Sequence, residues 1–295
     1  MDLDPHAPGS LAGSDRMQPH IFRMALRYIL MLEPILGYAA SIMATGGCCP
    51  TCKASLRGYS EQIITNHTVS CAHGGYTQKV SSEIVGALQR SFWELGVSSE
   101  REKAGLSTTS AHRPGDAVTE PLSVPLSFDC GGEHRIVLDG CVSYYNATNA
   151  ALVNNDPEGA VQKAEADKLA KLHKEVQDGL RSQLPPGYTF VPACVDSRGR
   201  PGPGMERLLS WMAEHGSRHQ RFTGTDASAK VDARLMIRFR ARVAVALHRG
   251  LMQGYLYRAQ LVGKREHHVT GRTPVDALGL RWQGLGRALG TLRAA

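Results

Sequence analysis

Two pairs of potential zinc ligands follow each other in the sequence. Cys49 and Cys52 are separated by two residues, and His67 and Cys71, separated by three, come after a further 14 residues. The first spacing is typical of a tight knuckle that points both sulfurs at one ion, and the second fits one helical turn. Four such ligands complete a closed tetrahedral shell with no open position for chemistry. We therefore predict a structural zinc site here.

The spacing leaves the identity of two of these ligands open. Cys48 could take the place of the cysteine that follows it, and His73 could replace the last cysteine of the set. Unrelated free thiols are the alternative to any metal site.

A second candidate site combines carboxylates from different parts of the chain. Asp116 follows a Pro-Gly corner, and Asp139 ends the apolar run at 136–138. A carboxylate at the end of a buried strand is costly unless it is paired or binds a metal. Mg²⁺ prefers a few carboxylates together with water. With Glu100 as a third ligand, these residues predict a magnesium- or manganese-dependent site for phosphodiester hydrolysis.

Lysines on a predicted helix could complete this site. Lys168 is our first choice for orienting the attacking water or stabilising the transition state, and Lys171 is the second. Each residue also has an ordinary interpretation: both aspartates as turn residues, and the lysines and Glu100 as solvated surface charges. Their order along the chain favours the site over these separate explanations.

Composition is compatible with a polyanionic partner without establishing one. The 295 residues contain 34 Lys and Arg against 27 Asp and Glu, a formal net charge of +7, and the sequence pI is near 9.1. DNA is the expected partner, with RNA as the alternative. The candidate nucleic-acid contacts are Lys53, Arg57, Arg113 and Lys171.

Cysteine usage and the first residues favour an intracellular protein. Four of the seven cysteines lie within residues 48–71, which indicates a metal site in a reducing compartment rather than a disulfide framework. The first 20 residues are polar and show no secretory signal. The apolar stretch 28–44 is short and interrupted by Glu33-Pro34, so it predicts a buried helix pair rather than a membrane span.

Predicted helices and strands alternate along the chain and carry the candidate site residues. Apolar periodicity and breakers predict a helical segment, the cysteine-rich knuckle, a helix, several short strands, a long helix, a strand and further helices. This order predicts an α/β (α+β) fold with a small mixed sheet flanked by helices. Strands are predicted at 117–118, 123–128, 135–142 and 188–195, and helices at 21–32, 35–43, 80–95, 160–180, 205–215 and 230–260.

The order of these motifs resembles the C-terminal part of reverse transcriptases from site-specific non-LTR retrotransposons, in which a zinc motif precedes a restriction-endonuclease-like domain. The likeness covers roughly residues 20–260. It is carried by Ala25-Leu26-Arg27-Tyr28, Cys49-Pro50-Thr51-Cys52, His67-x3-Cys71, Gly74-Gly75, Leu95-Gly96-Val97-x2-Glu100, Arg113-Pro114-Gly115-Asp116, Val137-Leu138-Asp139, Lys168-x2-Lys171, Gly187-x2-Phe190-Val191-Pro192 and the helix around 234–249.

The resemblance implies a domain that makes the nick priming target-site reverse transcription. It implies that Asp116, Asp139 and Glu100 bind the catalytic Mg or Mn ion, that Lys168 is the lysine supplied by the following helix, and that the protein is nuclear. From the resemblance and the composition along the chain, we expect five segments: a flexible lead and helical segment at 1–45, the zinc knuckle at 46–76, a domain at 77–200 that the resemblance implies to be restriction-endonuclease-like, C-terminal helices at 201–263 and a basic Gly-rich tail at 264–295.

The sequence departs from the family pattern in four places. Gly115 intervenes in the usual Pro-Asp turn, Gly140-Cys141 follow Asp139 where other restriction-type nucleases place a lysine, and Gln78-Lys79-Val80 replace the usual residues after the zinc motif. The fingers and palm of a polymerase are missing. A truncated or domesticated endonuclease is the first hypothesis. A nuclease-dead nucleic-acid-binding module and a recruited structural or interaction protein are the alternatives.

Overall fold

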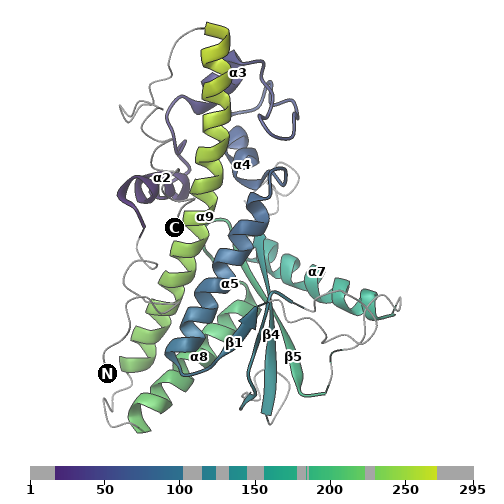
Figure 1. Ribbon diagram of the computed structural model, residues 1–295, viewed down its shortest axis with the longest axis vertical. Helices are drawn as coiled ribbons and strands as arrows, with labels where there is room; N and C mark the ends of the chain where they lie inside the picture. Colours follow the sequence, from purple (N-terminus) through teal and green to yellow (C-terminus); the bar gives the residue numbers. More distant parts are fainter. Residues whose placement is uncertain are drawn as a thin grey trace. The chain divides into compact units, whose positions relative to one another are not determined.

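The computed structural model describes residues 17–101, 115–123, 133–144, 156–177, 184, 186–222 and 230–270 (Figure 1). These residues form a mixed α/β structure, as predicted. The helices are α2 (Pro19–Ile29), α3 (Tyr38–Ala44), α4 (Glu61–Ser70), α5 (Tyr76–Glu94), α7 (Pro157–Gln177), α8 (Pro203–Phe222) and α9 (Lys230–Thr270), and the strands are β1 (Ser99–Arg101), β2 (Ala117–Thr119), β3 (Leu122–Ser123), β4 (Glu133–Ser143) and β5 (Tyr188–Asp196).

Contacts divide the chain into two compact units. We call the described part of residues 78–143 and 156–247 the sheet unit, and the described part of residues 17–77, 144 and 248–270 the helical unit. The boundaries fall within α5 and α9, so the predicted C-terminal helices at 201–263 belong partly to each unit. Among the helices of the described residues, none is both long and apolar enough to cross a membrane.

The sheet is mixed because β4 pairs differently on its two sides. On one side β4 is antiparallel to β2, which is in turn antiparallel to β1, and the short strand β3 pairs with the start of β4. On the other side β4 is parallel to β5, and the pairing runs along the whole length of β5 from Arg135 to Ser143 of β4. A parallel pair needs a crossover connection, and α7 lies in that connection, packing on both strands.

Alternating residues of β4 serve two faces of the sheet. Ile136 and Leu138 are fully buried, and the Cα of Gly140 lies against Val85 of α5. By alternation, Val137 and Asp139 point to the opposite face. There Val137 packs with Val118 in a cluster that also contains Leu184, Tyr188 and Phe190.

Most predicted elements are present with shifted ends. Strand β4 matches the predicted run at 135–142, and Pro192 lies in β5, which pairs only with β4 among the described strands. Of the predicted strand 123–128, only residue 123 is described. Helix α9 continues to Thr270, which corrects the prediction that a tail begins at residue 264. Residues 271–295 lie outside the described part.

Candidate metal centres

A tight knuckle presents the first two cysteines. Cys48 and Ser55 form an antiparallel bridge, and the backbone N–H of Cys49 donates to the carbonyl of Ala54 at 2.9 Å. The N–H of Lys53 donates back to the Cys49 carbonyl at 3.2 Å, and Lys53 adopts a left-handed φ of 66°. The chain therefore turns back on itself within six residues, which leaves both sulfurs on the inner side of the turn.

Helix α4 presents the other two ligands. The Ser60 hydroxyl caps its start by accepting the Ile63 N–H, and Thr68 on its buried side contacts the Tyr38 hydroxyl at 3.4 Å. His67 lies in the last turn and Cys71 follows directly after the helix. Their spacing of four positions places them one above the other on the same side of the helix end. The sequence predicted this helical turn but not the whole helix.

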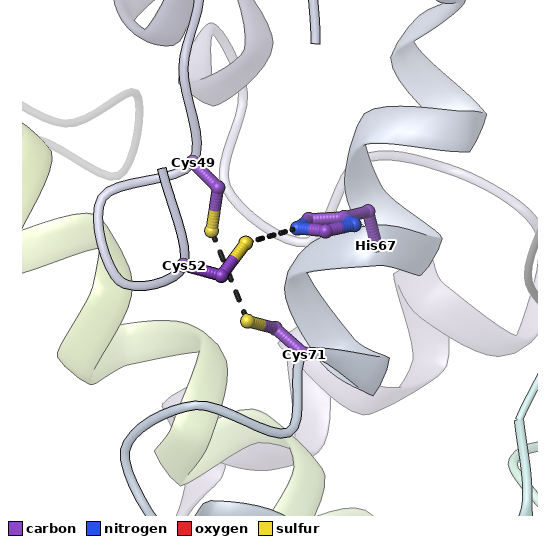
Figure 2. Close-up of side chains that lie close together, drawn as sticks. All are labelled: Cys49, Cys52, His67 and Cys71. Atoms are coloured by element: carbon purple, nitrogen blue, oxygen red, sulfur yellow. Dashed lines mark hydrogen bonds between the residues drawn. The ribbon is translucent and has the colours of Figure 1, made fainter. Parts of the chain in front are cut away.

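The four side chains converge on one point (Figure 2). Their ligand atoms all lie within 4.8 Å of one another. The Sγ atoms of Cys49 and Cys71 are 3.9 Å apart, and Cys52 Sγ is 3.3 Å from His67 Nε2. A tetrahedral zinc ion with Zn–S near 2.3 Å implies S–S separations of roughly 3.8 Å. The arrangement thus fits a Cys₃His zinc ion.

The two open ligand identities are resolved by geometry. Cys48 Sγ points back to the Gly46 carbonyl at 3.6 Å and lies outside the converging group. His73 is exposed and also lies outside it, while its carbonyl accepts a hydrogen bond from Arg258. The four predicted residues, and not these two alternatives, therefore form the site.

The electrostatics of the site shift the pKa values of Cys49 and Cys52 in opposite directions. Burial raises the pKa of the Cys49 thiol, but hydrogen bonds from His67, Thr51 and the Cys52 backbone outweigh burial and lower this pKa to about 5. Burial and the neighbouring Cys49 and Cys71 sulfurs raise the pKa of Cys52 to about 11. Zinc binding must therefore displace the proton of the Cys52 thiol, which makes zinc affinity fall as the pH falls.

A buried arginine holds the backbone next to the last ligand. Arg258 of α9 is fully buried, and its Nη2 donates to the carbonyls of Cys71 at 2.6 Å and His73 at 3.1 Å. Its guanidinium also lies over the Tyr76 ring, 5.6 Å from the centroid. Sequence reasoning missed this residue. Its one signal is a lone arginine among apolar residues of a predicted helix.

Replacing Arg258 with methionine should destabilise the helical unit by about 3 kcal/mol. The variant keeps the apolar volume but leaves the buried Cys71 carbonyl and the partly buried His73 carbonyl without a charged donor, and each loss at a buried group costs about 1–3 kcal/mol. Denaturant unfolding followed by far-UV circular dichroism measures the change. Lys264→Met on the same helix, at an exposed position, is the matched control. Equal stability of the two variants would show that the Arg258 contacts carry little energy.

Lys53 and Arg57, the two basic residues predicted to contact nucleic acid beside the knuckle, donate hydrogen bonds to the backbone of the knuckle. Lys53 Nζ donates to the Pro50 carbonyl at 3.0 Å, and Arg57 Nε donates to the Gly46 carbonyl at 3.3 Å. A Cβ built on Gly47 would lie 2.5 Å from Arg57 Cγ, so this arginine covers the start of the knuckle. Both side chains are exposed, and their contact with nucleic acid stays a prediction.

In the sheet unit, Asp116 is tied to β4 on both sides of Asp139. Its N–H donates to the Leu138 carbonyl at 2.7 Å, and its Oδ2 accepts the Gly140 N–H at 2.8 Å. A Cβ on Gly115 would lie 2.5 Å from the Leu138 oxygen. Only glycine allows this close approach, which gives a physical reason for the residue inserted into the Pro-Asp turn.

Lys168 reaches the same place from α7. Its Nζ lies 2.8 Å from Asp139 Oδ2, and the two side chains are 33% and 23% exposed. One turn earlier on α7, the buried carboxylate of Glu165 accepts the backbone N–H groups of Gly204 and Met205. Glu165 therefore caps α8 and anchors α7, which holds Lys168 beside β4. Asp139 lies inside β4 and not at its end, which corrects the prediction of a strand-end carboxylate.

Several charges act on Asp116. Burial raises the pKa of its carboxyl, and the charge of Asp139 adds to this, while the Gly140 N–H, Lys168 and Arg101 act in the opposite direction. Arg101 was missed by sequence reasoning. It lies on β1 and is held by Gln89 Oε1 at 2.7 Å and the Ser82 carbonyl at 3.0 Å. A Cβ on Gly86 would lie 2.5 Å from its Nη2, so its position depends on glycine in α5.

The other predicted members of this site are not gathered with the two aspartates. Glu100 is exposed on β1 opposite Val118, one strand away from Asp116 and further along the ladder. Within the described part of the chain, the only cluster of three or more potential ligands is the Cys/His group. The prediction that Glu100 completes a set of three carboxylates is thus corrected. Lys171 is exposed one turn beyond Lys168, and Arg113 lies outside the described residues.

One disulfide bond differs from the expectation of reduced cysteines. Cys141 and Cys194 are direct partners in the parallel register of β4 and β5, and they are joined. They lie 53 positions apart in the sequence, so only the strand pairing brings them together.

Replacing Asp116 with asparagine should stabilise the metal-free protein at neutral pH. Because the pKa of Asp116 is raised in the folded chain, the folded state binds this proton more tightly than the unfolded state does. Ionising Asp116 in the folded chain therefore lowers the free energy of unfolding. This loss of stability is absent below the ordinary pKa of 3.8 and complete once the pH exceeds the folded-state pKa. Thermal unfolding at both extremes tests this, with Asp167→Asn on an exposed face as control. A variant less stable than wild type at neutral pH would contradict it.

No protein-family model matches this chain, and comparison with curated proteins finds no match.

Proposed function

We propose that this chain is a divalent-metal-dependent DNA endonuclease that nicks its substrate by phosphodiester hydrolysis. The observation that carries the proposal is that Asp116 accepts the N–H of Gly140, next to Asp139 in β4, while Lys168 pairs with Asp139, so that the charges of Asp139 and Lys168 both act on Asp116. Two carboxylates from adjacent strands and a lysine 2.8 Å from one of them supply the groups that this chemistry needs. The zinc knuckle has a structural role because its four ligands leave no open position.

The two aspartates would hold a magnesium or manganese ion together with water molecules. Such an ion activates a water molecule and neutralises charge that develops on the phosphate. Asp116 is held by backbone on both sides, so its carboxylate stays in place during reaction. Lys168 is partly exposed beside it and can turn from Asp139 towards a phosphate oxygen, where a cation stabilises the transition state.

The resemblance to the endonuclease region of site-specific non-LTR retrotransposon reverse transcriptases supports the same proposal. The aspartates and the helix-borne lysine stand in the order of that family, and a mixed sheet with a parallel β4–β5 pair and a helix between is compatible with a restriction-endonuclease-like fold. Under this proposal the substrate is a DNA target site and the protein acts in the nucleus.

A plasmid assay with lysine variants tests the proposed function. Zinc-loaded wild-type protein should convert supercoiled plasmid to the nicked form with Mg²⁺ or Mn²⁺ and not with a chelator of these ions. Lys168→Met should lower the rate roughly 100-fold, the cost of losing one transition-state donor. Lys174→Met is the matched control, because Lys174 is exposed on the same helix six positions away, and it should change the rate less than about threefold. Equal effects of the two substitutions would remove Lys168 from the mechanism.

A nuclease-dead nucleic-acid-binding module is the second candidate, favoured by one observation. Among the described residues no third carboxylate joins Asp116 and Asp139 in a possible metal cluster, and Lys168 pairs with Asp139. Such a module would bind DNA or RNA with an affinity that falls steeply with salt, because phosphate contacts release counterions. It would cut nothing with any divalent ion. Binding insensitive to both salt and surface charge would point instead to a recruited interaction protein.

A further inference from the structure

A glycine inside α5 makes room for a guanidinium group. Gly86 lies in the middle of this helix, although glycine is a poor helix former. A Cβ built on it would lie 2.5 Å from Nη2 of Arg101, which comes from the neighbouring strand β1. Any side chain at position 86 would therefore push the guanidinium of Arg101 away from α5.

A second arginine reaches the same space. Arg90 follows Gly86 by one helical turn, and its Nη1 lies 3.7 Å from the same built Cβ. Nitrogen atoms of two guanidinium groups thus lie within 4 Å of one point on α5. Two positive charges this close repel each other, and a bound anion removes the repulsion. Because guanidinium groups match phosphate oxygens in geometry as well as charge, the two arginines have the composition of a phosphate site.

Arg101 is held in place and still has donors for a ligand. Its Nε donates to Gln89 Oε1 at 2.7 Å, and its Nη2 donates to the Ser82 carbonyl at 3.0 Å. Gln89 is itself fixed, because its amide nitrogen lies 3.4 Å from the carbonyl and 3.3 Å from the hydroxyl of Ser99. Within the described part of the chain, both acceptors of Arg101 are neutral and neither is used by Nη1. The exposed guanidinium therefore keeps its charge and the two Nη1 hydrogens for a bound group.

The two arginines lie beside the Asp116 carboxylate. In the β1–β2 ladder Arg101 is opposite Ala117, the residue that follows Asp116. On α5, the Ser81 carbonyl lies 3.3 Å from a Cβ built on Gly140, and so does Asp116 Oδ2. The next carbonyl along this helix is the one that accepts the hydrogen bond from Arg101. Successive peptide groups of α5 thus contact the surroundings of Asp116 and the guanidinium of Arg101.

We propose that Arg90 and Arg101, which we call the arginine pair, hold a phosphate group of the bound DNA strand next to the phosphate that is cut. This inference rests on the proposed function, because it takes Asp116 as the place of cleavage. The pair positions the strand and takes no part in proton transfer. Contacts of this kind fix the register of a nucleic acid on the protein and read no sequence. All DNA sequences should therefore depend on the arginine pair to the same degree.

DNA binding by the full-length, zinc-loaded chain without divalent ions tests the proposal, measured by fluorescence anisotropy of a labelled duplex. Gly86→Ala is the sharpest variant. Its methyl group displaces Arg101 Nη2, while every charge of the protein stays and α5 gains a better helix former. Its affinity should fall roughly tenfold, the effect of losing one charge-assisted hydrogen bond.

Arg101→Met removes the charge itself and adds a second readout. Its affinity should also fall roughly tenfold, and the slope of log affinity against log salt should become shallower by about 0.9, the change expected for one lost phosphate contact. Arg234→Met is the matched control, because it removes the same charge at an exposed position of α9 in the sheet unit. The control should change the affinity less than about threefold.

Three results would overturn the proposal. Binding of DNA by Gly86→Ala as tightly as by wild type would show that the position of Arg101 does not matter. Equal losses in Arg101→Met and Arg234→Met would reduce the effect to overall charge. Calorimetric titration that finds wild type binding inorganic phosphate, with no binding of DNA and with loss in Gly86→Ala, would assign the arginine pair to a free phosphate compound.

Failure of the proposed function gives a different pattern. A protein that needs the arginine pair to bind DNA, but nicks no plasmid with any divalent ion, would keep the phosphate site and lose the endonuclease. A protein that nicks plasmid, and whose Gly86→Ala variant binds and nicks like wild type, would keep the endonuclease and lose the phosphate site.

Discussion

Loss of the metal ligands should unfold the helical unit. Cys71→Ser is expected to abolish stoichiometric zinc binding and to remove the unit's cooperative unfolding transition. Binding of structural zinc contributes roughly 10 kcal/mol to small domains, which is comparable to the whole stability of a domain. Zinc content by elemental analysis and helix content by circular dichroism measure both effects, with one ion per chain expected in wild type.

The structure explains why one ligand has so large an effect. Cys71 joins the knuckle to the end of α4 through the metal, and its carbonyl is the acceptor for buried Arg258. Removing the ion therefore loosens the knuckle, α4 and the middle of α9 together. Cys48→Ser is the matched control, because this thiol lies beside the site and outside the ligand group. Zinc loss in Cys48→Ser, or a fully folded unit without metal, would contradict this account.

Asp139→Ala, a change in the sheet unit, should abolish DNA nicking. It should leave the zinc site of the helical unit intact. The substitution removes one of two carboxylates proposed to hold the catalytic ion and leaves Lys168 without its partner. A bound ion supplies several kcal/mol of transition-state stabilisation, so its loss lowers the rate by roughly a thousandfold or more.

The matched control for this variant is Asp167→Ala. Asp167 is exposed on α7 and pairs with Lys163 at 3.1 Å, so its removal should change the rate less than about threefold. Zinc content and thermal unfolding of both variants check that they are folded. Residual nicking in Asp139→Ala at the wild-type rate would assign the activity to other residues or to a contaminant.

Local signals explain which parts of the molecule could be predicted from sequence. The zinc ligands are separated by short spacings that a knuckle and one helical turn satisfy, so type and spacing were sufficient. Strand β4 was recognisable because Ile136, Val137 and Leu138 form an apolar run bounded by turn residues. Helix α7 was recognisable from its alanine, lysine and leucine content.

Residues that depend on distant pairing could not be predicted. The Cys141–Cys194 bond follows from the register of β4 with β5, and Arg101 acts on Asp116 only because β1 pairs with β2. Glu100 was chosen from its place in the order of motifs, but the β1–β2 ladder sets it opposite Val118 and away from the carboxylate pair. Register, and not residue type, decided each of these cases.

Mn²⁺ binding to zinc-loaded protein tests most directly whether Asp116 and Asp139 form a divalent-ion site. Electron paramagnetic resonance of free Mn²⁺ counts the bound ions in wild type and in the double variant Asp116→Asn, Asp139→Asn. The account predicts a site in wild type that disappears in the double variant while zinc stays bound. Equal Mn²⁺ binding by both proteins, or none by folded wild type, would contradict it.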